Sequence, residues 1–166
     1  MSAEDLYQGM LSAGVELAVA LPDSLLSPLC AMTAERGEIP YVQCCDEATA
    51  IGIAAGANLA GTCTLVLMEN SGLRRACETL SRFVLSHRLH VAMLLSHRGA
   101  FGEANWWGLA HSETMAPHLE MLRIKTEHVT AAVDFEDALR RAYSTLRTGQ
   151  SSVALVAERS ALSVSR

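Results

Sequence analysis

The chain has 166 residues, of which half are hydrophobic and 19% are charged, and its formal net charge is −5. This composition is typical of one globular domain that buries a substantial core, and it excludes a disordered tail. The acidic balance without a basic stripe argues against broad nucleic-acid binding. No apolar run reaches the length of a membrane span, and no signal-peptide pattern opens the chain.

The apolar patterns predict helices and strands in strict alternation. Gly14, Gly37 and the turn at Pro22-Asp23-Ser24 end or begin helices. In chain order we expect a helix over about residues 3–13, a strand at 15–21, a helix at 24–36, a strand at 41–44, a helix at 47–60, a strand at 62–68, a helix at 75–86, a strand at 91–95, a loop from 96 to about 111, a short helix near 113–120, a strand at 122–126, a helix at 134–146 and a strand at 153–157.

This alternation predicts an α/β fold: a three-layer sandwich with a mostly parallel sheet of about six strands and helices on both faces. In such sheets, ligands bind in loops beyond the carboxyl ends of the strands, near a reversal of strand order. The loops in question are 22–24, 45–47, 69–73 and 96–111. Three of these four loops carry the most polar residues of the chain, which favours a binding site there.

The cysteines and histidines do not predict a metal site in this chain. The five cysteines lie mostly in apolar runs, without CxxC spacing or a Cys/His zinc pattern, and we expect reduced thiols in a cytoplasmic protein. They are Cys30, Cys44, Cys45, Cys63 and Cys77. The six histidines are dispersed and none forms HExxH.

The stretch from Cys44 to Gly61 is rich in alanine and glycine, so its helix can approach neighbours closely or leave room for a ligand. Glu47 stands at the start of this helix beside apolar sequence, where burial would raise the pKa of its carboxyl group. Asp46 is placed to cap the helix. On this stretch alone, we prefer the interpretation that both acids only cap the helix and favour its dipole.

Several well-known site motifs are missing. There is no GxGxxG after the first strand, no GxxxxGK[ST] and no GxSxG elbow, so Rossmann, P-loop and hydrolase-elbow interpretations fail. What remains is a combination in fixed order: PDS at 22–24, DEATAIGIAAGANLAG at 46–61, MENSGL at 68–73 and LLSHRGAFGE at 94–103. With these motifs, nearly the whole chain resembles the pyrimidine-binding (PYR) domain of thiamine-diphosphate-dependent decarboxylases, in the sulfopyruvate and phosphonopyruvate decarboxylase branch.

The resemblance implies a role for Glu47 as the catalytic residue. In that family a buried glutamate hydrogen-bonds N1′ of the cofactor's aminopyrimidine and promotes its imino tautomer, which starts the chemistry that the cofactor carries. A shielded carboxyl with a raised pKa suits this proton relay. The resemblance also implies that Asn70, Ser71 and Gly72 bind the pyrimidine end; for Ser71 a simple helix cap is an equal alternative.

Four further residues are candidates to face the substrate. Asp23 and Ser24 follow the first strand, although a helix cap explains at least Ser24 without a substrate. Arg98 and His111 are placed to meet an anionic head group, since a guanidinium matches a sulfonate or phosphonate; either can instead be an exposed loop charge. Trp106-Trp107 lies in the same predicted loop and indicates an interface or a lid.

The chain departs from the family pattern near these candidates. Glu69 stands where the family tends to have glutamine, Arg74-Arg75 stand where a Gly-Asn pair is usual, and Ala48 replaces the glycine after the catalytic glutamate. These departures leave the implied cofactor activation intact. They leave open whether activity is lost or redirected and which substrate is used.

The family holds Mg²⁺ and the cofactor's diphosphate through a GDG motif on a separate PP domain, and this sequence has no GDG. We therefore expect residues 1–166 to be a single PYR domain that requires a PP-domain beta subunit. That subunit would hold the Mg²⁺ of the thiamine diphosphate cofactor. The active site would then lie between the two chains, and like subunits would pair into a heterotetramer or a larger assembly.

The resemblance thus implies the alpha subunit of a heteromeric decarboxylase that converts sulfopyruvate or phosphonopyruvate to the corresponding acetaldehyde and carbon dioxide. A decarboxylase or carboligase for another 2-oxo acid is an alternative within the enzyme class. A non-catalytic PYR-like partner subunit, or a stand-alone flavodoxin-like binding domain, is an alternative from another class. The sequence does not determine the head group of the substrate, whether ligation follows decarboxylation, or how many alpha and beta subunits assemble.

Overall fold

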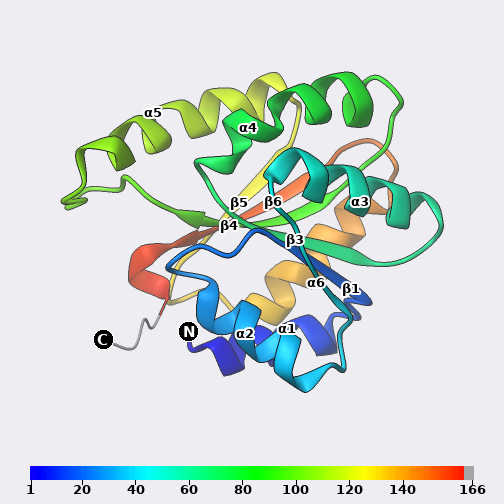
Figure 1. The fold of residues 1–166 in the computed structure, drawn as a ribbon, viewed down its shortest axis with the longest axis horizontal. Helices are drawn as coiled ribbons and strands as arrows, with labels where there is room; N and C mark the ends of the chain where they lie inside the picture. The colour runs from blue at the N-terminus through cyan, green and yellow to red at the C-terminus, as the bar shows by residue number, and fades with distance from the viewer. Residues whose placement is uncertain (163–166) are drawn as a thin grey trace.

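The computed structural model describes residues 1–162 of the chain, in which six helices, six strands and two shorter helical segments alternate (Figure 1). In chain order the elements are α1 (Ala3–Ser12), β1 (Leu17–Ala20), α2 (Ser27–Arg36), β2 (Tyr41–Gln43), α3 (Glu47–Leu59), β3 (Thr64–Glu69), α4 (Gly72–Glu78), the π-helical η1 (Thr79–Leu85), β4 (Ala92–His97), α5 (Trp106–Met121), β5 (Lys125–Val129), α6 (Phe135–Leu146), β6 (Val153–Glu158) and the 3₁₀ segment η2 (Arg159–Ala161).

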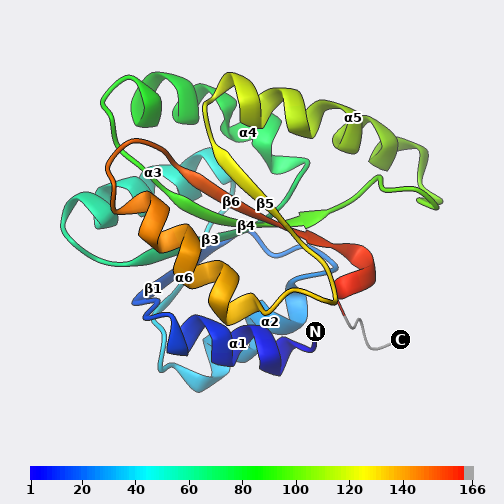
Figure 2. The ribbon, with the colours of Figure 1, turned by 180° about the vertical axis from the view of Figure 1, so that it is seen from behind.

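The six strands form one sheet in the order β2-β1-β3-β4-β6-β5, and every neighbouring pair is parallel. Helices α3, α4 and α5 cover one face, and α1, α2 and α6 cover the other (Figures 1 and 2). The predicted three-layer α/β sandwich is therefore confirmed. The strand order reverses between β1 and β3, because β2 lies on one side of β1 and all later strands lie on the other.

Two hydrophobic clusters fill the space between the layers. The α1/α2/α6 side is built from large side chains such as Tyr7, Leu29 and Leu139. The α3/α4/α5 side contains several small residues, among them Ala50, Ala54 and Ala76. Both clusters draw on alternate residues of the same central strands, so the two helical layers are held by a sheet whose four central strands are buried, while its edge strands β2 and β5 are largely exposed.

Side-chain caps fix where several helices begin. Ser2 and Asp5 form a reciprocal capping box at α1. Asp46 accepts a hydrogen bond from the Thr49 amide at 2.8 Å, so the predicted cap of α3 is confirmed. Asp134 caps α6 in the same way through the Asp137 amide.

The predicted loop from 96 to about 111 is wrong in its second half. Helix α5 begins at Trp106, so the two tryptophans and His111 lie on the helix and not in a loop. Gly108 lay in the predicted loop, yet it is accommodated within the 16 residues of α5, as is Pro117. The strand expected at 122–126 begins only at Lys125, because Leu122 still caps the helix. Within residues 1–162, no helix combines the length and apolar character that a membrane crossing requires.

Candidate functional site

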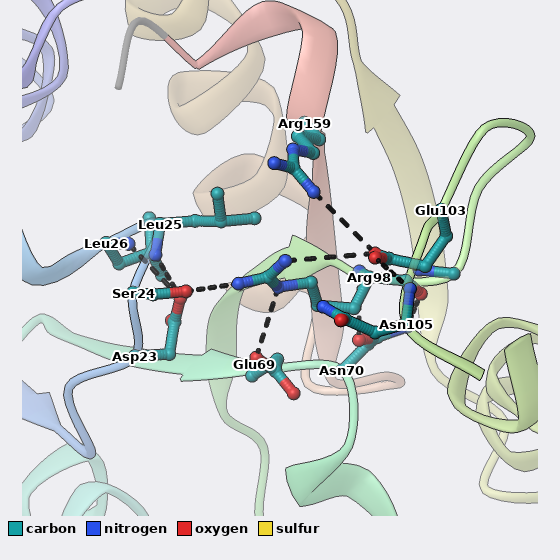
Figure 3. A network of polar contacts seen from close by, with 11 residues as sticks. Asp23, Ser24, Leu25, Leu26, Glu69, Asn70, Arg98, Glu103, Asn105 and Arg159 are labelled. Atoms are coloured by element: carbon teal, nitrogen blue, oxygen red, sulfur yellow. Dashed lines mark hydrogen bonds and ion pairs between the residues drawn. The ribbon is translucent and has the colours of Figure 1, made fainter. Parts of the chain in front are cut away.

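The candidate site lies at the carboxyl ends of β1, β3 and β4, beside the reversal of strand order (Figure 3). The chain leaves β1 toward α2 on one face and leaves β3 toward α4 on the other. We call the edge between these two turns the crevice, because ligands of open α/β sheets bind at such a position. The turn after β1 supplies Asp23 and Ser24, and the turn after β3 supplies Asn70. The structure thus brings together residues that are distant in the sequence.

Glu47 is the first residue of α3, and its side chain lies directly against Gly72, the first residue of α4. A Cβ atom added at Gly72 would lie 2.5 Å from Cγ and 2.8 Å from Oε1 of Glu47, so only glycine allows this approach. Glu47 is half-buried in the chain, and no donor among residues 1–162 hydrogen-bonds its carboxylate. The carboxylate is therefore held in place by packing while its oxygens remain available to a ligand.

Asp23 folds the turn after β1. Its Oδ1 accepts hydrogen bonds from the amides of Leu25 and Leu26 at 2.7 and 3.2 Å, so Asp23, and not Ser24, supports the start of the α2 region. Its other oxygen, Oδ2, is buried without a hydrogen-bond partner, as is the hydroxyl of Ser96 on β4. Burial raises the pKa of Asp23 despite the two amide hydrogen bonds.

Asn70 connects the turn after β3 to the end of β4. Its side-chain Nδ2 donates to the Arg98 carbonyl at 2.9 Å and its Oδ1 accepts from the Arg98 amide at 3.1 Å. The side chain is buried and its donor and acceptor both serve this link, so its predicted contact with a cofactor stays a prediction. Ser71 precedes α4, but its hydroxyl makes no cap to the helix, so the capping alternative does not explain this residue.

Arg98 is the centre of a polar network that spans the crevice (Figure 3). Its guanidinium donates to the Ser24 hydroxyl, and it lies 3.6 Å from Glu69 Oε2 and 3.8 Å from Glu103 Oε2. The Arg98 side chain is 18% exposed, so these contacts are largely shielded from water. Two carboxylates already compensate its charge, which makes Arg98 a link between three loops; contact with a substrate stays a prediction.

Glu103 was not singled out in the sequence, yet its side chain is only 2% exposed. It accepts hydrogen bonds from the amides of Asn105 at 3.1 Å and Gly99 at 3.4 Å, and Arg159 approaches it at 3.8 Å. The Asn105 amide, with help from the Gly99 amide and the two arginines, lowers the pKa of Glu103 although burial opposes this. Glu103 thereby fixes the loop after β4.

Gly99 packs against the start of α5. A Cβ atom at Gly99 would lie 1.9 Å from the Gly108 carbonyl oxygen, and its φ of +91° also favours glycine. The positive φ and the close contact with Gly108 explain why glycine stands at position 99. The loop after β4 folds tightly back onto the first turn of α5.

His111 and Arg74 form a second polar pair beside this network. Arg74, on α4, points its guanidinium at Nδ1 of His111 on α5. Burial and the neighbouring guanidinium together lower the pKa of His111, so the imidazole is neutral and can accept this hydrogen bond. Arg74 has no carboxylate partner within residues 1–162, in contrast to Arg98. Glu69 and Arg74 both differ from the family pattern. Glu69 contacts Arg98 and Arg74 contacts His111, which are the two residues predicted to face the anionic head group of the substrate.

The surface next to the site carries exposed apolar side chains. Trp106 and Trp107 are 80% and 50% exposed, and Phe101 is fully exposed. On the outer side of α3, a Cβ atom at Gly52 or Gly56 would meet no atom within 4 Å, so this side is open. A cavity of about 500 Å³ lies instead at the amino ends of the strands, near Asn58 and Cys63, and it contains none of the predicted site residues.

The fold is found in thiamine-diphosphate-dependent enzymes. A thiamine diphosphate-dependent 4-hydroxybenzoylformate decarboxylase from Rhodococcus jostii superposes with a TM-score of 0.66 at 16% identity, over 96% of this chain and 30% of that chain. At this identity the likeness shows the fold alone. The chain therefore has the fold of a domain that occurs in this class of enzyme.

Sequence comparison is more specific. The chain is 36% identical over 102 residues to sulfopyruvate decarboxylase subunit alpha of Methanothermobacter thermautotrophicus. The aligned residues make up 61% of this chain and 62% of that protein. It is 29% identical over 103 residues to phosphonopyruvate decarboxylase of Streptomyces viridochromogenes, over 62% of this chain and 26% of that protein. The chain is thus homologous to sulfopyruvate decarboxylase alpha subunits, as the motifs indicated, although it matches less than two thirds of their length. No model of a known protein family matches the chain.

Proposed function

We infer that the chain is the PYR-type alpha subunit of a heteromeric thiamine-diphosphate-dependent decarboxylase. Its substrate is a small anionic 2-oxo acid, sulfopyruvate or phosphonopyruvate in the first place. The observation that carries the proposal is the position of Glu47, which lies at the reversal of strand order, packed on Gly72, with its carboxylate free of partners among residues 1–162. The homology to subunits of that name supports the same conclusion.

The residues of the crevice suit the pyrimidine end of thiamine diphosphate. Glu47 offers a carboxylate for a ring nitrogen, and Gly72 keeps that carboxylate against the turn after β3. Asp23 Oδ2 and Ser96 Oγ are buried at the same edge without a hydrogen bond of normal geometry. Burial raises the pKa of Asp23 while the nearby Ser96 hydroxyl opposes this rise, so the two groups face each other there. When bound, the cofactor supplies the electron sink for decarboxylation, and this chain's part is to bind and polarise its pyrimidine end.

The charges around the crevice suit a substrate with a second anionic group. Arg98 is compensated by Glu69 and Glu103, whereas the exposed Arg74 is free of carboxylates among residues 1–162 and contacts His111. A sulfonate or phosphonate would find a guanidinium there without displacing a carboxylate. Whether the head group is sulfonate, phosphonate or another acid is the open part of the proposal.

A PP-domain beta subunit would complete the site and hold the Mg²⁺ of the cofactor. The relative from Methanothermobacter thermautotrophicus is itself called a subunit. The open side of α3 at Gly52 and Gly56 and the exposed tryptophans of α5 are the surfaces that we assign to subunit contacts. Pairing of like subunits and a cytoplasmic location remain predictions.

The experiment is reconstitution with a beta chain that carries GDG and a downstream asparagine. The complex is given thiamine diphosphate, Mg²⁺ and, one at a time, sulfopyruvate, phosphonopyruvate and pyruvate, and carbon dioxide release is measured. We expect release from a sulfonate or phosphonate substrate and at least tenfold less from pyruvate, about 1.4 kcal/mol in transition-state binding. Cofactor binding without carbon dioxide release from any 2-oxo acid would favour a non-catalytic subunit, and preference for pyruvate would indicate another decarboxylase or a carboligase.

A further inference from the structure

Three metal-binding side chains meet at the carboxyl ends of the last three strands of the sheet. His97 ends β4, Glu158 ends β6 and His128 lies on β5. In the sequence they are separated by 31 and 30 residues, which is why the histidine spacing gave no motif. This group is distinct from the crevice between β1 and β3, since β4 and β6 follow farther along the sheet.

The register of the strands places the three side chains on one face. His97 pairs directly with Glu158 across β4 and β6. His128 pairs with Val156, and residues two apart on a strand share a face, so His128 and Glu158 lie diagonally on the same side. Glu127 points to the opposite side, where it contacts Arg141 of α6. The backbone alone therefore brings the two histidines and the carboxylate together on the α5 side.

The ligand atoms of the group converge. His97 Nδ1 lies 2.8 Å from Glu158 Oε2, and His128 Nδ1 lies 2.7 Å from Glu158 Oε1. The ligand atoms of all three residues lie within 4.8 Å of one another, close to the spacing around one metal ion. The two imidazole rings stand nearly perpendicular, with centroids 6.1 Å apart. A small displacement of the side chains would replace the shared hydrogen bonds by bonds to a cation.

A second layer of contacts orients the buried histidine. His97 is only 7% exposed, and its Nε2 lies 3.0 Å from the Ser112 hydroxyl of α5. Metal-binding histidines commonly hydrogen-bond through the nitrogen that does not face the metal, which fixes the ring. The nearest cationic side chains turn away from the group, since Arg98 and Arg159 both point to Glu103. A cation would thus meet two imidazoles and one carboxylate.

We propose that His97, His128 and Glu158 form a binding site for Zn²⁺ or a similar divalent transition metal. Two imidazoles and a carboxylate suit Zn²⁺, whereas Mg²⁺ prefers an all-oxygen shell. Three protein ligands leave one position for water, and the half-exposed His128 gives the ion access to solvent. The ion would join β4, β5 and β6 at the end where the loops of the catalytic crevice begin. The site does not depend on the proposed decarboxylase activity.

The test is Zn²⁺ titration of the full, untagged chain after treatment with a chelator. Calorimetry measures stoichiometry and affinity, and Co²⁺ in place of Zn²⁺ reports the ligand geometry through its visible absorption. We expect one ion for each chain, tetrahedral Co²⁺ absorption and a higher melting temperature with Zn²⁺. Wild-type protein that binds no Zn²⁺ would overturn the proposal and leave the three residues as a hydrogen-bonded group.

Three variants locate the ion. His128→Asn removes a ligand and should weaken Zn²⁺ binding at least tenfold. Ser112→Ala keeps all three ligands and should weaken Zn²⁺ binding by no more than about 10–100-fold. His87→Asn is the matched control, because His87 is exposed and lies outside the proposed site, where its imidazole contacts the carbonyl and the ring of Phe83. Equal binding by wild type and His128→Asn, or a loss confined to His87→Asn, would contradict the site. Circular dichroism checks folding, and Glu158→Gln serves if His128→Asn does not fold.

Discussion

The two helical layers of the molecule differ in what they present beyond the sheet. The α1/α2/α6 layer is packed with large side chains, and α6 covers its strands with a regular apolar face ending in the buried Tyr143, whose hydroxyl donates to the Thr64 carbonyl. The α3/α4/α5 layer mixes small residues, mainly on α3, with large side chains such as Leu80 and Leu119, and it leaves Gly52, Trp106 and Trp107 open to the outside. Glu47 and Gly72 belong to this second layer.

This difference in packing indicates that the two layers contribute differently to the stability of the fold and to its function. Large side chains that fill a layer completely contribute apolar burial, while small residues permit close approach by a ligand or another chain. We therefore assign the α1/α2/α6 layer mainly to stability and the α3/α4/α5 layer mainly to the proposed function, while the turn before α2 contributes Asp23 and Ser24 to the candidate site. Substitutions in the α3/α4/α5 layer should therefore change mainly turnover, and substitutions in the α1/α2/α6 layer should change mainly the free energy of unfolding.

The largest effect is expected for Glu47→Gln in the reconstituted complex. Gln has nearly the same shape but cannot act as the carboxylate that polarises the pyrimidine, so turnover should fall by roughly 10²–10⁴-fold or to background. Carbon dioxide release measures the loss. Glu35→Gln, at an exposed position on α2 in the α1/α2/α6 layer, should keep wild-type turnover. Near-normal activity of Glu47→Gln would remove Glu47 from the mechanism.

Leu139→Ala should do the reverse. Leu139 is fully buried on α6, and its truncation should reduce the free energy of unfolding by about 2–5 kcal/mol through lost burial and a residual cavity. Urea denaturation measures the change. Under conditions where the variant is folded, its turnover in the complex should match wild type; a selective loss of turnover would show that the two layers are not independent.

Gly72→Ala tests the contact that fixes Glu47. The added Cβ would lie 2.5 Å from Glu47 Cγ, so the glutamate must shift, at a cost of about 1–3 kcal/mol in stability. We expect a clear loss of turnover together with this destabilisation. Gly52→Ala is the matched substitution at an open helical position and should stabilise the isolated chain by roughly 0.5–1 kcal/mol. A Gly52→Ala chain that no longer binds the beta subunit would mark this side of α3 as the interface.

The smallest predicted effect is on the pH dependence of the free energy of unfolding, to which Asp23 contributes. Its folded-state pKa is raised above the ordinary 3.8, so the protonated form stabilises the fold, and this contribution is lost as pH rises through the folded-state pKa. In Asp23→Asn, the free energy of unfolding should lack this pH-dependent component. Denaturant melts from pH 4 to pH 8 measure it; identical pH profiles for wild type and variant would show that Asp23 is not buried as described.

The sequence predicted the alternation, the parallel sheet and the position of Glu47 because these follow from local apolar periodicity and from motif order. It could not predict the partners of Arg98, since Glu69 and Glu103 approach it only once β3 and β4 are paired. The start of α5 at Trp106 was missed because the glycines and polar residues of 96–111 favoured a loop over a helix that begins in this segment. Asn70 was predicted to bind the cofactor, and that contact stays a prediction; its link to the Arg98 backbone could not be predicted because it depends on strand pairing.

The most direct test of the central claim is the rate at which the C2 proton of thiamine diphosphate exchanges with deuterium in the reconstituted complex, followed by NMR. If Glu47 activates the cofactor, the wild-type complex should exchange this proton far faster than free cofactor, and Glu47→Gln should return the rate close to that of free cofactor with the cofactor still bound. Exchange by Glu47→Gln at the wild-type rate would contradict the assignment of Glu47 as the activating residue.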